Sequence, residues 1–384
     1  APQRARLQAE EQARIEATQP AQESGSAEAP PPSGPVAREQ VLAQSAGARI
    51  VIDTPEVDGS IALEGARIDD LNLRDYRRTI DPGSGEVTVL APRAAEFAHD
   101  AFFGWEMRNG ENTATLADAF SGWSATEGAR LTPETPVTLT LAAGEGLTIE
   151  RTISIDQNYM FTITDVVRNS SGAPISARPF GTVRRMGLPQ DYVRNQIVHQ
   201  GLIGAFGENN NLRQVTYENA NKHIRDRARG RVGAEERIEE MQGQGGWFGI
   251  TDHYWLAAIV PAQSERVSTY FDARSEGAVN DYRAAYRGDW REIAAGGEVT
   301  YTQHLFAGAK RYEVLRDYQN TMSIPRFDDA IDWGNFWFLT RPFFQWLLHP
   351  LAQIFADWGV VFNFGLAILA STIVIKLLLF PLVY

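Results

Sequence analysis

The sequence predicts a mainly β protein, with antiparallel sheets packed face to face and followed by helices. Three observations support this fold class. Runs of alternating or β-branched residues, bounded by turn residues, fill the chain from Gly47 to about Gly308. Strands do not alternate with helical patterns, which argues against a parallel α/β sheet. An aromatic segment interrupted by prolines and a long apolar run complete the sequence.

The composition bounds the kinds of function. Of the 384 residues, 43% are hydrophobic, which is enough for a substantial core, and the formal net charge is −12. Because neutralising phosphates needs a basic surface, we expect no nucleic acid as a partner. Anionic lipid would also repel this surface, so a hydrophobic segment must hold the protein at the bilayer. The chain has no cysteine, which rules out disulfides and cysteine metal sites.

Residues 1–46 are predicted to form a flexible tether rich in proline, glycine and serine. Residues 3–17 are strong helix formers without an apolar stripe, and residues 18–35 are too polar to bury anything. The sequence starts at Ala1 rather than at a methionine. We therefore expect a processed or a shortened chain.

Residues 47–325 are predicted to form the β domain with its short C-terminal helix. The strand signals are clearest at residues 48–53, 137–141, 147–155, 160–167 and 299–306. Turn residues at 81–85, 142–146 and 169–172 separate strands. A region of about 260 residues is large for one sandwich, so we expect two fused sandwich halves.

Four segments of this region have a different character. The charged residues 219–242 predict an exposed insertion or hairpin, and the glycine-rich residues 201–207 and 243–249 predict tight turns and bulges. Residues 310–320 predict a helix that packs through Tyr312, Leu315 and Gln319 and ends before Pro325. This helix would be the joint between the soluble and membrane parts.

Residues 326–359 are predicted to form an interfacial amphipathic helix. Pro342 and Pro350 would cut it into pieces too short to cross a bilayer. Several tryptophans suit the membrane surface. A core helix packed on the soluble domain is the alternative. A polar stripe recurs at every fourth position: Arg341, Gln345, His349, Gln353 and Asp357.

Residues 360–384 are predicted to form a transmembrane helix. The run 364–384 carries a single charge, Lys376, and at about 1.5 Å per residue it spans a hydrocarbon core of roughly 30 Å. A buried helix of a soluble enzyme is the alternative.

Lys376 is a candidate functional residue, because a charge at this depth marks a functional site by default. Thr372 lies one helical turn before Lys376 and Gly365 lies three turns before it, so the three share a helix face. We expect this face to look into the protein rather than into lipid. Alternatively, Lys376 extends its side chain to the cytoplasmic interface.

Signatures of catalysis are largely missing from the sequence. The six histidines show neither H-x-H nor H-E-x-x-H spacing, and no G-x-S-x-G motif occurs. Asp252 and His253, next to Tyr254 and Trp255, form the one cluster with an acid, a base and aromatic neighbours. We predict no enzyme activity, no catalytic residue, no cofactor and no metal site.

Four segments together carry a resemblance to a known family. They are residues 245–261, beginning G-G-W-F-G-I-T-D-H-Y-W, residues 332–339, D-W-G-N-F-W-F-L, residues 363–376, N-F-G through T-I-V-I-K, and residues 380–382, F-P-L. From about Gly47 onward the chain resembles the YidC membrane-protein insertases of Gram-negative bacteria. In that family a first transmembrane helix precedes the tether, and further helices with a basic cytoplasmic hairpin follow the second. Because this sequence contains neither part, we expect it to be a fragment.

The resemblance implies a chaperone-like insertase of the bacterial inner membrane. It implies that the β region is a periplasmic β-supersandwich, similar to sugar-mutarotase folds but without their activity. The implied partners are nascent inner-membrane proteins, components of the Sec translocon and the lipid bilayer. Lys376 and Thr372 would line a hydrophilic substrate groove open to the cytoplasm. The family often has arginine where this chain has Lys376, which keeps the charge but not the guanidinium geometry.

Two other classes of function stay open at this point. One is a membrane-tethered carbohydrate-active enzyme, which would need a histidine and a carboxylate converging in a sugar-sized cleft. The other is a periplasmic scaffold that binds a protein or peptide along a sheet edge.

Overall fold

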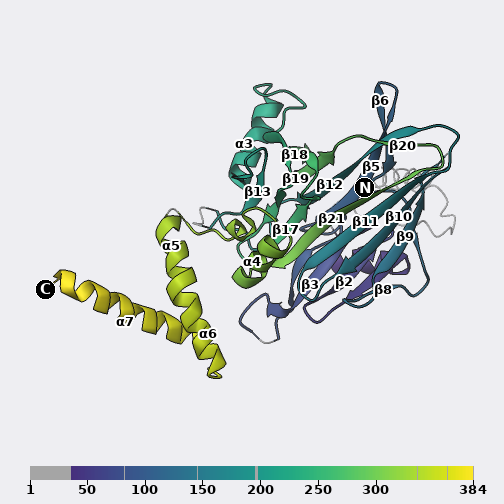
Figure 1. Cartoon of the computed structure of the whole chain (residues 1–384). Coiled ribbons are helices and arrows are strands. Elements are labelled where there is room, and N and C mark those ends of the chain that lie inside the picture. The colour runs from purple at the N-terminus through teal and green to yellow at the C-terminus, as the bar shows by residue number, and fades with distance from the viewer. Residues whose placement is uncertain are drawn as a thin grey trace, which may run out of the picture. The chain divides into compact units, whose positions relative to one another are not determined.

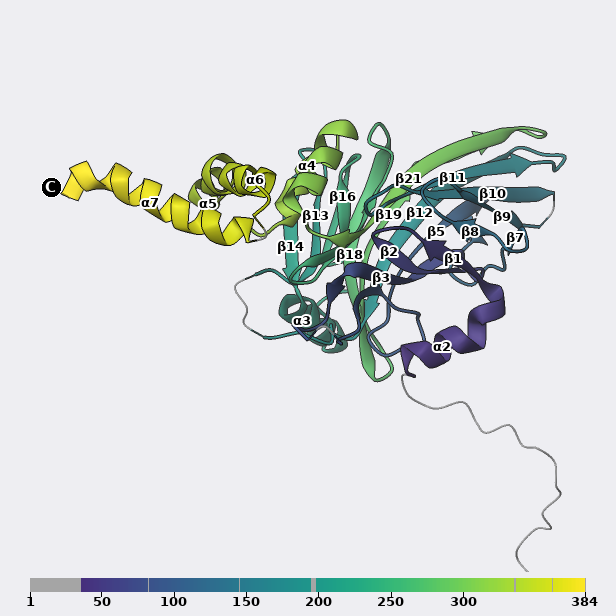
Figure 2. The ribbon, with the colours of Figure 1, turned by 90° about the horizontal axis from the view of Figure 1, so that it is seen from below.

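The computed structural model describes residues 36–81, 83–144, 146–194, 198–334, 336–360 and 362–383. Most of the tether predicted for residues 1–46 lies outside these residues. Its last part differs from the prediction, because residues Arg38–Ser45 form the helix α2. The Arg38 guanidinium pairs with the Asp70 carboxylate, which links α2 to the strand β3 (Arg67–Arg77) beside it (Figure 2).

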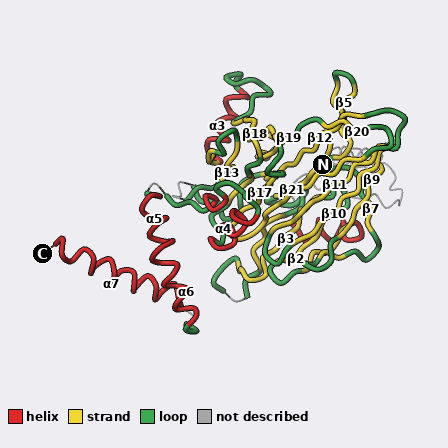
Figure 3. The backbone as a smooth tube through the Cα atoms, in the orientation of Figure 1, coloured by secondary structure: helices red, strands yellow, loops and turns green. Residues whose placement is uncertain are grey.

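Two large sheets make up the region between Arg49 and Ala309, where strands dominate in Figure 3. The first has the order β15-β18-β19-β12-β5-β3-β2-β1-β8, with β20, β4 and β6 attached to β12, β3 and β5. Its strands are β1 (Arg49–Asp53), β2 (Val57–Ala62), β3, β4 (Glu86–Leu90), β5 (His99–Asn109), β6 (Asn112–Ala117), β8 (Arg130–Leu131), β12 (Ile175–Met186), β15 (Glu239–Gln244), β18 (Arg266–Glu276), β19 (Val279–Gly288) and β20 (Arg291–Ile293).

The second sheet has the order β14-β13-β16-β17-β21-β11-β10-β9-β7. Every strand pair described in the two sheets is antiparallel except β1 with β8. The predicted fold class, antiparallel sheets in a mainly β protein, is therefore confirmed (Figure 1). The strands of the second sheet are β7 (Ser124–Ala125), β9 (Val137–Ala142), β10 (Leu147–Ile155), β11 (Met160–Asn169), β13 (Gly201–Phe206), β14 (Asn211–Thr216), β16 (Trp247–Thr251), β17 (Trp255–Val260) and β21 (Glu298–Ala309).

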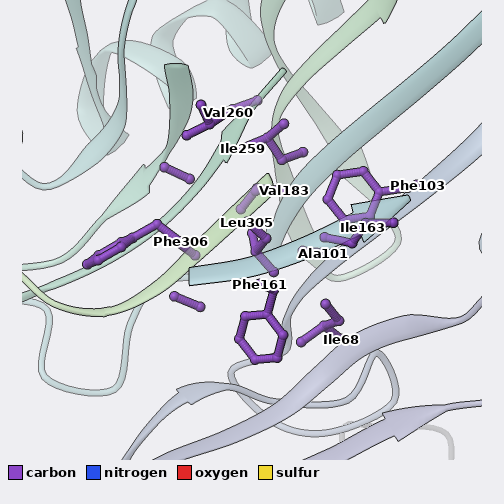
Figure 4. Close-up of a cluster of buried hydrophobic side chains, with 14 of the residues drawn as sticks. Ile68, Ala101, Phe103, Phe161, Ile163, Val183, Ile259, Val260, Leu305 and Phe306 are labelled. Carbon is purple, nitrogen blue, oxygen red and sulfur yellow. The ribbon is translucent and has the colours of Figure 1, made fainter. Parts of the chain in front are cut away.

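The core lies between the facing sides of these sheets. Figure 4 shows side chains from both, such as Phe103 of β5 and Phe161 of β11, within one buried cluster. Strand β10 explains the packing, because every second residue from Leu147 to Ile155 is buried, as the strict alternation predicts.

One of these buried positions in β10 is charged. Arg151 Nε and Nη2 donate to the two carboxylate oxygens of Asp165 at 2.7 and 2.8 Å. Arg151 also donates to the Phe103 carbonyl at 3.0 Å, and Trp105 Nε1 donates to Asp165 at 2.8 Å. Because Phe103 and Trp105 belong to the other sheet, this ion pair ties the two sheets together.

The charged segment 219–242 is not a simple hairpin. Residues Tyr217–Ala228 form the helix α3, whose N-terminus is capped by the Thr216 hydroxyl accepting from the Asn219 amide. The glycine predictions hold only in part. Gly245 and Gly246 form a tight turn with positive φ, whereas residues Gly201–Phe206 are the regular strand β13.

Helix α4 (Tyr312–Thr321) follows β21, close to the predicted 310–320. Its buried face carries Val314, Leu315 and Tyr318, so the predicted packing face was right only at Leu315. The Tyr318 hydroxyl donates to Asp156 at 2.5 Å, which fixes α4 on the sheets. The short 3₁₀ helix η2 (Phe327–Ala330) comes next.

The prediction that prolines interrupt the following segment was wrong. Helix α5 (Trp337–Phe343) contains Pro342 and continues through a π-helical turn, η3 (Phe344–Leu348), into α6 (His349–Asp357). Pro350 occupies the first turn of α6, where a missing N–H is tolerated. The wider hydrogen-bond spacing of the π turn lets the helical path continue between the two prolines. Helix α7 (Asn363–Val383) ends the described chain.

Candidate functional site

Helix α7 is the one helix in the described residues that is long and apolar enough to cross a membrane. Its large side chains are open, with Leu369 63%, Leu377 68% and Leu378 68% exposed. This openness disfavours a buried helix of a soluble enzyme, because such a helix would cover these side chains.

Lys376 and Thr372 are both exposed on α7. The Thr372 hydroxyl donates to the Ile368 carbonyl one turn earlier at 2.8 Å. The face of α7 that packs within this chain is a different one. It carries Ala367 and Ser371, at 0% and 1% exposure, and Asn363, which donates to the Ala352 carbonyl of α6 at 3.2 Å. The predicted role of Lys376 and Thr372 in a groove therefore stays a prediction.

Two residues of the polar stripe of α5 to α6, Arg341 and His349, contact the β domain, whereas Gln353 and Asp357 are exposed. Arg341 Nη2 lies 2.5 Å from Asp328 Oδ2, and Arg341 Nη1 lies 2.8 Å from Asp329 Oδ1. Eight residues further along, His349 pairs with Glu313 of α4. These contacts join the C-terminal helices to η2 and α4. They favour, for this face of the helix, the alternative of packing on the soluble domain.

The same helical segment also carries exposed aromatic side chains. Trp337 is 61% and Trp346 79% exposed, and Trp358, just after α6, is 72% exposed. Large apolar side chains exposed at this density on one segment mark a surface that meets a partner or a membrane. The segment thus combines polar contacts to the β domain with exposed aromatic side chains suited to a bilayer surface.

Asp252 and His253 line a cavity of about 600 Å³ in the β domain. Asp252 Oδ2 accepts from Arg185 Nη2 at 2.7 Å, and the Arg185 side chain is only 5% exposed. Burial raises the pKa of Asp252, although Arg185 and Lys310 act in the opposite direction. Burial lowers the pKa of His253, so this histidine is neutral at neutral pH.

His199 is not among the residues that line this cavity. Its backbone N–H donates to Asp332 at 2.8 Å and its Nε2 lies 3.0 Å from the Leu202 carbonyl. Lys310 donates to the Thr251 hydroxyl at 3.0 Å and to the Asp252 carbonyl at 3.1 Å, and burial lowers its pKa to about 8. Across the part of the chain that the structure describes, no group of three or more histidine and carboxylate side chains is arranged to hold a metal.

Comparison with known proteins decides the family. The sequence pattern of the family described as "YidC periplasmic domain" matches residues 49–346, which is more than half of the chain. The chain belongs to the YidC family. The β domain is therefore a periplasmic domain, and the protein that contains it is an inner-membrane protein.

Curated YidC proteins resemble most of this chain. A protein named "Membrane protein insertase YidC" from Methylobacterium radiotolerans is 41% identical over 352 residues, covering 91% of this chain and 54% of that protein. The protein of the same name from Caulobacter vibrioides is 38% identical over 357 residues, with coverages of 88% and 54%. The chain thus spans about half the length of the curated YidC relatives it matches.

Solved structures show only a distant likeness. A galactose mutarotase-like protein from Lactobacillus casei has a TM-score of 0.40 and 10% identity, and the match covers 67% of this chain and 99% of that one. No conclusion about activity follows from a similarity of this size.

Sequence reasoning missed the Arg185–Asp252 pair and the cavity around it. The two residues lie 67 positions apart, on β12 and on the loop after β16, and no local motif links them. It also missed the acidic partners of Arg341. The adjacent Asp328 and Asp329 could have been noticed as counter-charges 13 and 12 positions before Arg341.

Proposed function

We propose that this chain is part of a membrane-protein insertase that assists the insertion and folding of inner-membrane proteins. The observation that carries the proposal is the direct succession of a YidC periplasmic domain and an apolar helix with one positive charge, Lys376. The names of the curated relatives support it.

In this proposal the chain has four functional parts. Residues 1–46 are a tether whose last part is the helix α2, 47–325 the periplasmic domain, 326–359 the interfacial helix and 360–384 the transmembrane helix. The exposed tryptophans of the interfacial helix lie at the headgroups, where amphipathic rings are favoured. The ion pairs of Arg341 hold that helix to the domain, so the domain sits close to the membrane surface.

Lys376 and Thr372 line the substrate groove in this proposal. A hydrated groove lowers the cost of bringing a polar segment part-way across the bilayer, and Lys376 attracts acidic residues in that segment. The apolar helix of the substrate then partitions into lipid, a step driven by hydrophobic transfer that needs no nucleotide. The substrates are nascent inner-membrane proteins, which arrive alone or from the Sec translocon.

The periplasmic domain itself performs no catalysis in this proposal. The Asp252 carboxylate is held by Arg185, and His199 is engaged elsewhere, so these two residues do not form an acid–base pair. Epimerisation of an aldose by the purified chain, abolished in His253→Ala, would contradict this part.

Reconstitution tests the insertase proposal. A full-length YidC-family protein carrying this sequence, placed in liposomes, should insert a small inner-membrane protein with an acidic translocated segment, scored by protease protection. Liposomes without the protein, and liposomes with a variant lacking residues 363–383, are the controls. Equal protection in all three samples would refute the proposal.

A further inference from the structure

A groove of about 440 Å³ lies between helix α4 and the segment formed by η3 and α6. One wall is a single face of α4, since Arg316 and Asp317 follow Glu313 by three and four residues. This face is distinct from the buried face that packs α4 on the sheets. The other wall carries Trp346 and Gln353. The groove is thus built at the junction of the β domain and the interfacial helix.

An ion pair between the two helices fixes the width of the groove. His349 of α6 pairs with Glu313 of α4, and the His349 ring packs on Tyr312 with a centroid distance of 5.5 Å. Burial acts to raise the pKa of Glu313, but hydrogen bonding to His349 and to the backbone, with nearby positive charge, outweighs it, so the pKa is lowered. Glu313 is therefore a carboxylate at neutral pH, and its side chain is 49% exposed.

One cation and one carboxylate on the α4 wall have no oppositely charged partner in the part of the chain that the structure describes. Arg316 is exposed, and its Nη1 donates to the Tyr312 hydroxyl, which leaves Nη2 without a hydrogen bond there. Asp317 is exposed as well. Its backbone carbonyl accepts from the Thr321 hydroxyl at 2.8 Å, but none of the described donors reaches its carboxylate. A ligand in the groove can therefore reach both charged groups.

The groove lies at the level of the lipid headgroups, a placement that rests on the proposed function. Trp346 of the groove wall is 79% exposed, and tryptophan rings favour the headgroup layer. Asn363, at the start of α7, donates to the Ala352 carbonyl of α6 at 3.2 Å. This bond ties the beginning of the membrane span to the helix that forms the groove. The groove and the first turn of the span therefore share the polar boundary of the bilayer.

The charges of the groove discriminate between phospholipid headgroups. Arg316 suits a phosphate, which every glycerophospholipid carries. The carboxylates of Glu313 and Asp317 repel a headgroup of net negative charge and attract an ammonium group. A primary ammonium donates three hydrogen bonds, whereas a quaternary ammonium has no N–H to donate. The groove therefore fits phosphoethanolamine better than phosphoglycerol or phosphocholine.

We propose that the groove between α4 and α6 binds the headgroup of phosphatidylethanolamine from the periplasmic leaflet. The phosphate accepts from Arg316, and the ammonium donates to Glu313 and Asp317. Side chains three and four residues apart on a helix have Cβ atoms about 5–6 Å apart, which suits the two-carbon link between phosphate and ammonium. A lysine of a protein segment would satisfy the carboxylates but leave Arg316 without an anion. The bound lipid holds the junction of the β domain and the interfacial helix at the membrane surface.

Native mass spectrometry of the whole chain released from detergent micelles tests this proposal. The chain is mixed with equal concentrations of phosphatidylethanolamine, phosphatidylcholine and phosphatidylglycerol that carry the same acyl chains. Since the acyl chains contact α7 equally in all three lipids, differences in occupancy report on the headgroup. We expect phosphatidylethanolamine to bind about fivefold more tightly than either competitor, the size of one partly exposed ion pair.

Two exposed residues of the groove separate the contributions of ammonium and phosphate. Asp317→Asn should weaken the binding of phosphatidylethanolamine about fivefold and should not weaken that of phosphatidylglycerol. Arg316→Gln should weaken the binding of all three lipids, because each carries a phosphate. Arg231→Gln and Glu298→Gln, which remove exposed charges outside the groove, are the matched controls and should leave lipid binding unchanged.

Equal occupancy by the three lipids, or tighter binding of either competitor, would overturn the assignment to phosphatidylethanolamine. An unchanged lipid preference in folded Asp317→Asn would overturn it too. Arg316 and Asp317 lie on the surface of α4, so their replacement should not unfold the domain, and far-ultraviolet circular dichroism checks this. None of these readouts involves membrane insertion, so a failure here leaves the insertase proposal intact.

Discussion

The Arg341 guanidinium makes two ion pairs with adjacent carboxylates of η2, 2.5 Å to Asp328 and 2.8 Å to Asp329. The Asp328 side chain is 1% exposed and the Arg341 side chain 27%. A bidentate arrangement of this kind fixes orientation as well as distance. These pairs are the main polar connection between the β domain and the helix that we propose to lie on the membrane.

Replacing Arg341 should release this connection. In Arg341→Gln, Asp328 keeps a buried carboxylate without its cation, which costs about 3–5 kcal/mol in comparable buried pairs. We expect faster amide hydrogen exchange in residues 327–343, with little change in the sheets. Arg231→Gln, which removes an arginine 64% exposed and paired with Asp226, is the matched control and should change little. Identical exchange in both variants would show that apolar contacts alone hold α5.

A second prediction concerns the charged pair inside the sandwich. Arg151 and Asp165 are fully buried, so Asp165→Ala strands a guanidinium in the core, at a cost of about 3–5 kcal/mol. The melting temperature of the β domain should fall by roughly 6–20 °C. Thermal unfolding followed by near-ultraviolet circular dichroism measures this.

The control for this variant lies on the outer face of the same strands. Arg168 of β11 pairs with Glu150 of β10, and the two side chains are 44% and 40% exposed, in contrast to the fully buried Arg151 and Asp165. Glu150→Ala should therefore leave the melting temperature nearly unchanged. A fall as large as that of Asp165→Ala would mean that burial is not the reason for the effect.

A third prediction is acid sensitivity through His304 of β21. Burial lowers the pKa of His304 to about 4, below its usual value of 6.5, and its Nδ1 lies 3.1 Å from the Thr162 hydroxyl. Between pH 6.5 and 4 the unfolded chain binds a proton here that the folded chain does not. Stability should therefore fall as the pH drops through this window, by at most about 1.4 kcal/mol per pH unit from this group.

His304→Gln removes this titration and keeps a polar partner for Thr162. The difference in unfolding free energy between wild type and variant should vary with pH from 6.5 to 4 and be constant above 7.5. Urea unfolding at several pH values measures it. A difference that is independent of pH would rule out His304 as the titrating group.

A fourth prediction concerns the depth of the interfacial helix. Spin labels at positions 337 and 346, where both side chains are largely exposed, should lie near the lipid headgroups in proteoliposomes. A label at position 344, whose ring packs on Tyr312 with a centroid distance of 5.2 Å, should be the least accessible to lipid-soluble relaxants. Labels 337 and 346 at the bilayer centre would contradict the interfacial placement.

Local sequence patterns were sufficient to predict secondary structure where a pattern is compatible with only one kind of element. The alternation from Leu147 to Ile155 predicted β10 with its observed bounds. Apolar residues at every second position all lie on one face of a strand, whereas in a helix they would not share a face. Prolines misled at Pro342 and Pro350, since a π turn, which leaves no clear mark in the sequence, accommodates them. The partner of Arg185 lies 67 positions away and depends on a tertiary contact, so no local window of the sequence could show it.

The charge of Lys376 gives the last prediction. Lys376 is exposed in α7, on a different face from the buried Ala367 and Ser371. If Lys376 attracts acidic residues of an incoming segment, insertion should depend on the positive charge at position 376 more than on the shape of the side chain that carries it. In a full-length YidC-family protein carrying this sequence, Lys376→Arg should retain insertion. Lys376→Glu should reduce it at least tenfold for a substrate with acidic translocated residues, which corresponds to about 1.4 kcal/mol.

The same substrate with its acidic residues neutralised is the internal control, and its insertion should depend much less on the charge at position 376. Thr372→Val tests the groove separately, because it removes a hydroxyl of the same face without changing charge. Protease protection of the translocated segment in proteoliposomes measures all of these variants. Full insertion of the acidic substrate by Lys376→Glu would favour the alternative in which Lys376 reaches the cytoplasmic interface and only anchors the helix.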